Sequence, residues 1–218
     1  MSLLLQSLVF LSENPDNFID TFDLLSDINP EYFDFDNDSD LDLIIGTDFD
    51  PSDFPWVGKL VLFENIGLDE NNEPIWSLID DSYLGDGLGN NLSPVTVDID
   101  NDNDFDLFIG NFNGTIQFFE NIGNEENPIY EFVELLSNID LSGYSSPEFI
   151  DMDSDQDYDL LVGNMDGNIF FYENIGDIYN YNFQLNETNY QNINVGTRSM
   201  PLSYDYDYDG DEDLLIGS

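Results

Sequence analysis

The chain contains no cysteine, no histidine and only 2 basic residues among 218. Without cysteine it can form neither disulfides nor thiolate metal sites. Without histidine it lacks the usual general base and the commonest transition-metal ligand. With two basic side chains it has no basic patch to neutralise phosphate, so we expect neither nucleic acid nor an anionic membrane surface as a partner.

No apolar segment reaches the ~18 residues that a membrane-spanning helix requires. The apolar N-terminal stretch "MSLLLQSLVFLSEN" lacks both the basic start and the small-residue cleavage site of a signal peptide. We therefore expect no insertion into a membrane.

Acidic residues are abundant instead, and 48 Asp and Glu give a formal net charge of -46. Disordered acidic tails carry a similar charge, but they lack apolar and aromatic residues. This chain is 41% hydrophobic and 15% aromatic, which is enough to form a core. The sequence therefore predicts one folded domain over residues 1–218 that is hard to stabilise without cations.

One thirteen-residue motif occurs four times, and we call its copies Asp loops 1 to 4. Aspartate occupies positions 1, 3, 5, 7 and 9, apolar residues occupy positions 10 to 12, and glycine ends the motif. The copies are "DFDNDSDLDLIIG" (34–46), "DIDNDNDFDLFIG" (98–110), "DMDSDQDYDLLVG" (151–163) and "DYDYDGDEDLLIG" (205–217). Their first aspartates are 64, 53 and 54 residues apart, and a proline stands four residues before each. A period of this length is typical of propellers and repeat arrays.

Each repeat unit is expected to contain four short strands. One strand leads into the Asp loop, and a second leaves it. The turn signals Asn113-Gly114 and Asp166-Gly167 then separate the second strand from a third. In the first unit this hairpin is longer by about eight residues, 50–57. Because no apolar stripe of helical period appears, the sequence predicts an all-β fold, a β-propeller of four-stranded antiparallel blades.

The unit boundaries are expected at about 30–93, 94–146 and 147–200, with a split fourth unit made of 201–218 and 1–29. The chain ends two strands into a unit, whereas "LVFLSENPDNFIDTFDLLSDI" near the N-terminus resembles the second half of one. Two interpretations fit: the termini pair and close a four-bladed ring, or the chain is a fragment of a longer array. A closed ring predicts a monomer, and a fragment predicts self-association through exposed strands.

Alternating aspartates on a tight loop are typical of a site for a hard cation. Calcium takes 6–8 oxygen ligands from carboxylates and backbone carbonyls, whereas magnesium keeps several waters. The absence of cysteine and histidine disfavours zinc. An EF-hand requires glutamate at position 12 of its loop, where the Asp loops have Ile45, Ile109, Val162 and Ile216. The sequence therefore predicts about four bound calcium ions in loops that are not EF-hands.

The Asp loops resemble the FG-GAP or VCBS repeat of integrin-α-like calcium-binding β-propellers, and the likeness covers nearly the whole chain. "DYDYDGDEDLLIG" matches the family pattern in full, and "GNFNGTIQFFENIGN" and "GNMDGNIFFYENIGD" also look like members of it. Position 6, often glycine in the family, is Ser39, Asn103 and Gln156 in the other three loops. A turn residue at that position is expected to need positive φ.

This resemblance also implies the ligands of each Asp loop. Side chains at positions 1, 3, 5 and 9 and the backbone carbonyl at position 7 would bind the ion. The side-chain ligands would be Asp34, Asp36, Asp38 and Asp42; Asp98, Asp100, Asp102 and Asp106; Asp151, Asp153, Asp155 and Asp159; and Asp205, Asp207, Asp209 and Asp213. The carbonyl ligands would be those of Asp40, Asp104, Asp157 and Asp211.

Three further features are expected to have structural or partner-binding roles. The Glu-Asn pairs at 64–65, 120–121 and 173–174 are expected to cap the turn after the third strand. The aromatic runs at 118–119 and 170–172 are expected to pack between blades. Trp56 lies in the longer hairpin of the first unit and is a candidate partner-binding residue.

The resemblance and the repeat symmetry together imply a function. They indicate a non-catalytic calcium-binding propeller module, outside the cell or on its surface, for adhesion or for recognition of a protein or glycan. No unique carboxylate stands out once the Asp loops are set aside, so no catalytic residue is expected. The alternatives are a calcium-stabilised propeller enzyme that acts on polysaccharide and a cation buffer without a partner.

Overall fold

The computed structural model describes residues 28–48, 57–136, 139, 141 and 143–218. These residues form fourteen strands and one short 3-10 turn, η2 (Tyr190–Asn192), and no α-helix. The all-β prediction is therefore confirmed. None of the elements in these ranges is a helix long and apolar enough to cross a membrane.

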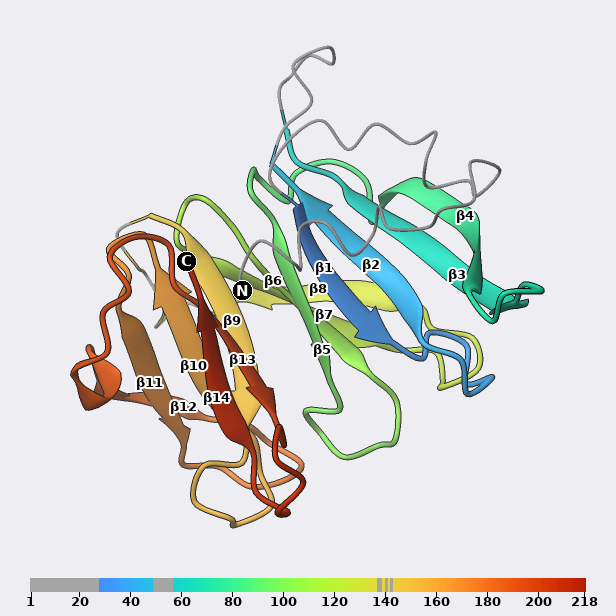
Figure 1. Cartoon of the computed structure of the whole chain (residues 1–218). Helices are drawn as coiled ribbons and strands as arrows, with labels where there is room; N and C mark the ends of the chain where they lie inside the picture. Colours follow the sequence, from blue (N-terminus) through green and yellow to red (C-terminus); the bar gives the residue numbers. More distant parts are fainter. Residues whose placement is uncertain (1–27, 49–56, 137–138, 140, 142) are drawn as a thin grey trace.

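The strands form four antiparallel sheets, one for each Asp loop (Figure 1). The first sheet has the order β1 (Ile28–Phe33), β2 (Asp42–Thr47), β3 (Leu60–Leu68) and β4 (Pro74–Tyr83). The second has β5 (Ser93–Val97), β6 (Asp106–Gly110), β7 (Ile116–Asn121) and β8 (Tyr130–Leu135). The third has β9 (Ser145–Ile150), β10 (Asp159–Asn164), β11 (Ile169–Asn174) and β12 (Phe183–Glu187), and the fourth has β13 (Met200–Tyr204) and β14 (Asp213–Gly217).

Neighbouring sheets pack through their first strands, β1 against β5, β5 against β9, and β9 against β13. The four Asp loops, each between the first and second strand of its sheet, lie together at the lower end of the molecule in Figure 1. The described strands form neither a closed ring nor a barrel, so the propeller stays a prediction. Residues 1–27 of the expected split unit and residues 49–56 of the longer hairpin, Trp56 included, lie outside the described residues.

The apolar positions 10 to 12 of the Asp loops form the second strands, and in the first three sheets these strands are the core. Leu43, Ile44 and Ile45 are 0% exposed, and so are Leu160, Leu161 and Val162. When a strand is paired on both edges and packed on both faces, its side chains are buried on both sides. Its sequence is then a continuous apolar run rather than an alternation of apolar and polar residues. The tripeptides therefore encode the centre of each complete sheet.

Aromatic side chains fill the spaces between sheets, as expected for the two aromatic runs. The Phe118 ring stacks on Phe108 within the second sheet, with centroids 4.5 Å apart, and meets Tyr181 of the third unit edge-on at 5.6 Å. Phe119 packs in the cluster that the first and second sheets share. In the third sheet, Tyr172 belongs to the cluster shared with the second.

The glycine that ends each of the first three Asp loops lies close to the backbone that leads into the next sheet. A Cβ atom on Gly110 would stand 2.2 Å from the carbonyl oxygen of Ser145, and one on Gly163 would stand 1.9 Å from that of Ser199. Gly46 has the same relation to Leu92, at 2.2 Å. No side chain fits at such distances, so the position requires glycine because of packing between units.

Candidate metal centres

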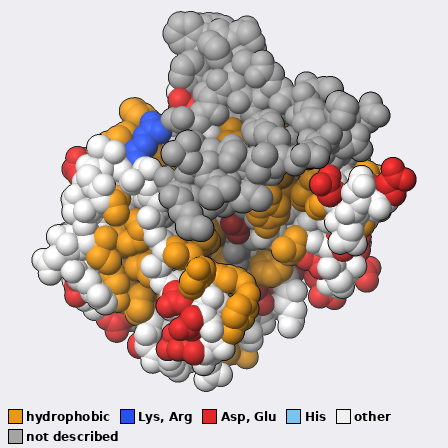
Figure 2. All heavy atoms as spheres, in the orientation of Figure 1, with side chains coloured by type: hydrophobic (Ala, Val, Ile, Leu, Met, Phe, Trp, Pro, Cys, Tyr) orange, Lys and Arg blue, Asp and Glu red, His pale blue; other side chains and the backbone are white. Residues whose placement is uncertain are grey.

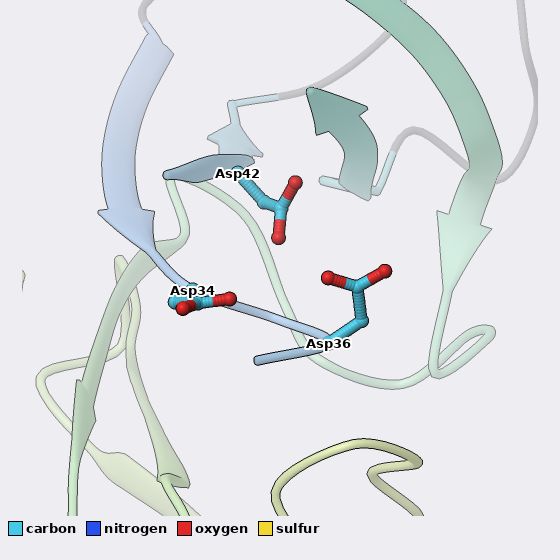
Figure 3. Close-up of side chains that lie close together, drawn as sticks. All are labelled: Asp34, Asp36 and Asp42. Atoms are coloured by element: carbon cyan, nitrogen blue, oxygen red, sulfur yellow. The ribbon is translucent and has the colours of Figure 1, made fainter. Parts of the chain in front are cut away.

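Each Asp loop brings three carboxylates together. In loops 1 and 4 they come from positions 1, 3 and 9, and in loops 2 and 3 from positions 1, 3 and 5. Within each group one oxygen per residue lies within 4.8 Å of the others; the groups are Asp34, Asp36 and Asp42; Asp98, Asp100 and Asp102; Asp151, Asp153 and Asp155; and Asp205, Asp207 and Asp213. Figure 3 shows the first group, whose three carboxylates point into one shared space. Positions 1 and 3 are therefore common to all four groups.

The position 1 carboxylate holds the loop backbone in its turn. Asp34 accepts the backbone N–H of Asp38 on Oδ1 at 3.1 Å and that of Ser39 on Oδ2 at 3.0 Å. Asp151 accepts the equivalent pair from Asp155 and Gln156, at 3.1 and 3.0 Å. Loops 2 and 4 repeat this arrangement. The sequence therefore encodes one loop conformation four times.

The turn requires left-handed backbone at two positions of every loop. At position 6 the φ angles are 76° for Ser39, 74° for Asn103, 81° for Gln156 and 97° for Gly210. The expectation of positive φ at this position is therefore confirmed. Position 4 has φ between 58° and 64° in all four loops, at Asn37, Asn101, Ser154 and Tyr208. Sequence reasoning missed position 4, although asparagine there in loops 1 and 2 is a usable signal.

In the first three Asp loops, the position 9 carboxylate is buried and connects the loop to the third strand. Asp42, 1% exposed, accepts the N–H of Phe35 on one oxygen at 2.7 Å and that of Asn65 on the other at 2.8 Å. Asp159 does the same with Met152 and Asn174, at 3.2 and 2.7 Å. These oxygens are thus engaged by the backbone, and each retains lone pairs for a cation.

In Asp loops 1 and 2, the position 3 carboxylate has a buried oxygen that no group of the described residues satisfies. The Oδ1 atoms of Asp36 and Asp100 are buried and have no hydrogen-bond partner in the described structure, and Oδ1 of Asp104 at position 7 is a third such atom. A buried carboxylate oxygen without a partner is costly. Asp36 and Asp100 belong to the carboxylate groups of their loops, so a cation there would satisfy these oxygens.

Burial and mutual repulsion both disfavour the charged form of these aspartates. Burial is the main cause that raises the pKa of Asp42 to about 6, that of Asp106 to about 7 and that of Asp159 to about 6. At position 7, burial followed by neighbouring carboxylates raises the pKa of Asp104 and Asp157 to about 6. A divalent cation among the carboxylates would offset both effects.

The asparagine of each Glu-Asn pair caps the turn after the third strand, as expected. Asn121 Oδ1 accepts the N–H groups of Gly123 at 3.0 Å and Ile129 at 2.9 Å. Asn174 Oδ1 accepts those of Gly176 at 3.1 Å and Asn182 at 2.8 Å. Because the backbone N–H of the same asparagine donates to position 9, the residue links the Asp loop to a turn far along the chain.

A small cleft opens between Asp loops 1 and 2. Its volume is about 150 Å³. The lining includes the aromatic residues Phe35, Phe105 and Tyr130 and the amides of Asn37 and Asn103. Phe105 is 43% exposed, so an aromatic surface is accessible beside two groups of carboxylates.

Comparison with known proteins gives no assignment. No protein-family model matches the chain, and no match is found among curated proteins. The site is therefore interpreted from its own geometry and from the resemblance of its loops.

Proposed function

We propose that the chain is a non-catalytic calcium-binding repeat module of the FG-GAP or VCBS type, folded as a β-propeller and binding about four calcium ions. The observation that carries the proposal is the fourfold group of carboxylates, each built on the same left-handed turn. The partnerless buried oxygens of Asp36 and Asp100 add independent support, because a cation would satisfy them.

Oxygen ligands alone favour calcium over transition metals. In each loop, the carboxylates at positions 1, 3, 5 and 9 would supply negative charge and the position 7 carbonyl a neutral oxygen. Calcium accepts such irregular sets of 6–8 oxygens, whereas magnesium requires near-ideal octahedra. Neither histidine nor cysteine is present to favour zinc or copper.

Calorimetric titration of chelator-stripped protein tests the metal proposal directly. We expect about four calcium ions per chain, and Asp100→Ala and Asp153→Ala should each remove one ion. Asp86→Ala, an exposed aspartate outside the Asp loops, should leave the number of bound ions unchanged. Absence of calcium binding at millimolar concentration, or equal loss in Asp86→Ala, would rule the proposal out.

The biological role that we propose is adhesion or recognition of a protein or glycan outside the cell, where calcium is abundant enough to saturate sites of ~10⁻⁴–10⁻³ M. The cleft between Asp loops 1 and 2 supports this role, because it presents aromatic and amide groups together. The visible face of the molecule also carries apolar side chains among acidic ones (Figure 2).

A binding screen against glycans and peptides, with hydrolysis measured in parallel, tests the recognition role. Binding that Phe105→Ala weakens at least tenfold, without turnover, is the expected result. Phe112→Ala is a matched control, since Phe112 is 48% exposed but does not line the cleft. Release of polysaccharide fragments would instead favour the enzyme alternative.

A further inference from the structure

The cleft between Asp loops 1 and 2 combines a mainly aromatic wall with a polar rim. Among its lining residues, Phe33 is buried, and Phe35 and Tyr130 are half-buried. Asn103 and Glu125 also line the cleft and are exposed. Pockets for drug-sized ligands have volumes of ~300–1,000 Å³, whereas this cleft has about 150 Å³. It therefore has room for a single side chain rather than for a larger ligand.

Hydrogen bonds and ring contacts hold the aromatic wall in place. The Tyr130 hydroxyl donates to the backbone carbonyl of Phe105 in Asp loop 2 at 3.0 Å. In Asp loop 1, the backbone N–H of Phe35 donates to Asp42 at 2.7 Å. The Phe35 ring also meets the Phe33 ring edge-on, with centroids 5.8 Å apart. A wall that is fixed before a ligand arrives lowers the entropy cost of binding.

The surroundings of the cleft are strongly negative. Asp loops 1 and 2 contain ten aspartates, of which Asp34 lines the cleft together with Glu125. Two bound calcium ions would still leave these loops with a formal charge of -6 (-10 + 4). The chain has two basic side chains, Lys59 and Arg198, and neither is among the described lining residues. A basic side chain in this cleft therefore has to come from another molecule.

An arginine side chain matches the aromatic, polar and electrostatic properties of the cleft. Its guanidinium group is planar and weakly hydrated, stacks on aromatic rings and offers five N–H donors. The aromatic lining provides surface for cation–π contact, and the side-chain oxygens of Asn37, Asn103 and Glu125 provide acceptors. A neutral sugar would use the rings and amides but not the negative charge, and the ammonium group of lysine is more strongly hydrated.

We propose that the cleft binds an arginine side chain of a partner protein. The inference rests on the recognition role proposed above and names its ligand. A basic surface around that arginine would suit the formal charge of -46, since complementary charge speeds association and disfavours wrong partners.

A titration followed by NMR tests the choice of ligand. The full chain, labelled with ¹⁵N, is titrated with N-acetyl-argininamide in millimolar calcium at ~0.15 M salt, and again without calcium. The amide signals of Phe35, Asn37, Asn103 and Phe105 should shift together and saturate, whereas those of Asp loops 3 and 4 should not. N-acetyl-citrullinamide, which is similar in shape but uncharged, should bind at least tenfold more weakly, and N-acetyl-lysinamide at least threefold more weakly.

Two glutamate variants separate binding at the cleft from general attraction to an acidic protein. Glu125→Gln should weaken argininamide binding about twofold or more, as expected for loss of an exposed ion pair. Glu126→Gln removes the same charge from an exposed neighbour outside the described lining and should leave the affinity unchanged. Equal effects of the two variants, or equal shifts in all four Asp loops, would show charge attraction alone and overturn the proposal.

The remaining outcomes also decide the proposal. Equal affinity for lysinamide would overturn the assignment to arginine, and saturable shifts at the cleft with methyl glycosides but not with argininamide would assign the cleft to a glycan. A partner found in the binding screen, without argininamide shifts at the cleft, would overturn this inference alone. Neither a partner nor shifts would overturn the recognition role as well. Argininamide binding at the cleft supports the inference even if calcium titration fails.

Discussion

The carboxylate of Asp42 accepts the backbone N–H of Asn65 at 2.8 Å, across 23 residues of chain. The same bond joins Asp106 to Asn121 at 2.8 Å and Asp159 to Asn174 at 2.7 Å. The last aspartate of the motif therefore holds its loop to the third strand of its sheet. If this aspartate also binds calcium, as we propose, one residue would couple the proposed metal site to the sheet that supports it.

Substitution at position 9 should cost stability even without metal. Asp159→Ala leaves the buried N–H of Asn174 and the part-buried N–H of Met152 without their acceptor, and a buried unsatisfied group costs ~1–3 kcal/mol. Urea unfolding with chelator, in 0.5 M salt to screen repulsion, should show that loss. Asp155→Ala, an exposed position of the same loop, is the control and should change unfolding little under these conditions. Equal losses in both variants would mean that position 9 acts through charge alone.

Left-handed backbone at position 6 predicts a stabilising substitution. Gln156 has φ 81°, and a non-glycine residue in this region costs ~1–2 kcal/mol, partly offset by the greater chain entropy of glycine. Gln156→Gly should therefore raise stability by about 1 kcal/mol, or the melting temperature by ~2–4 °C. The reverse change, Gly210→Ala, should lower it by a similar amount, because a Cβ there meets no atom within 4 Å and only the backbone is strained. A lower melting temperature for Gln156→Gly would contradict this account.

The sequence predicted the parts of the fold that repeat. Aspartate alternation located the four loops, the apolar tripeptides located the central strands, and Asn113-Gly114 located a hairpin turn between β6 and β7. These signals are local, so one sequence is enough to interpret them. The resemblance to a known repeat supplied the glycine preference at position 6, which the φ angles explain.

Contacts between units could not be predicted in the same way. The motif shows that position 13 is glycine, but not why. At Gly110 the reason is the backbone carbonyl of Ser145, more than thirty residues later in the chain, which leaves no room for a Cβ atom. The bond from Asn65 to Asp42 likewise joins segments whose proximity follows only from the sheet order. Long-range packing, not local preference, decides these positions.

The close approach at Gly110 makes a matched pair of substitutions informative. Gly110→Ala would force a Cβ against the backbone carbonyl of Ser145 at 2.2 Å, and neither group is a flexible side chain. Overpacking of this kind costs ~1–3 kcal/mol. Gly217→Ala, at the same motif position in the fourth sheet, meets first the flexible end of Met200 at 3.3 Å and should cost little. Thermal unfolding of the two variants checks this, and a large loss in Gly217→Ala would indicate a closed ring in which another unit packs there.

Two glutamates connect the first strands of neighbouring sheets. Glu31 Oε1 on β1 accepts the N–H and the hydroxyl of Thr96 on β5, both at 3.2 Å. Glu148 Oε1 on β9 accepts the N–H and the hydroxyl of Ser203 on β13, both at 2.7 Å. Burial raises the pKa of Glu31 from 4.5 to about 8, and that of Glu148 to about 7. Glu148 also acts on Glu31 by repulsion, and Glu212 acts on Glu148.

These raised pKa values predict that stability falls with rising pH. Between the ordinary pKa of 4.5 and the folded-state value of about 8, the folded protein holds a proton on Glu31 that the unfolded chain has released. The contribution of Glu31 to the free energy of unfolding is fully present below pH ~4.5 and is lost as the pH rises through ~8. Glu31→Gln keeps an acceptor for Thr96 without the charge, so it should stabilise by on the order of 2 kcal/mol at pH 8 and by little at pH 5. The test is urea unfolding at both pH values in saturating calcium. Glu131→Gln, on the exposed strand β8, is the control. If Glu31→Gln changed the free energy of unfolding equally at both pH values, the raised pKa of Glu31 would not be the cause.

Calcium removal should have the largest effect on the whole molecule. Four ions would change the formal charge from -46 to about -38 (-46 + 8), so the loops gain specific ligands while general repulsion persists. A ligand at 100 times its dissociation constant stabilises by ~2.7 kcal/mol per site, and several sites together reach the ~5–15 kcal/mol of an ordinary domain. Chelator at low salt should therefore leave the protein loosely folded or unfolded, and millimolar calcium should restore a cooperative transition. High salt should restore it only in part, because screening supplies no ligand to Asp36 or Asp100. Thermal unfolding followed by circular dichroism, with chelator, with calcium and with high salt, gives the melting temperature under each condition. If calcium did not raise the melting temperature, the four carboxylate groups would have no calcium-dependent stabilising role.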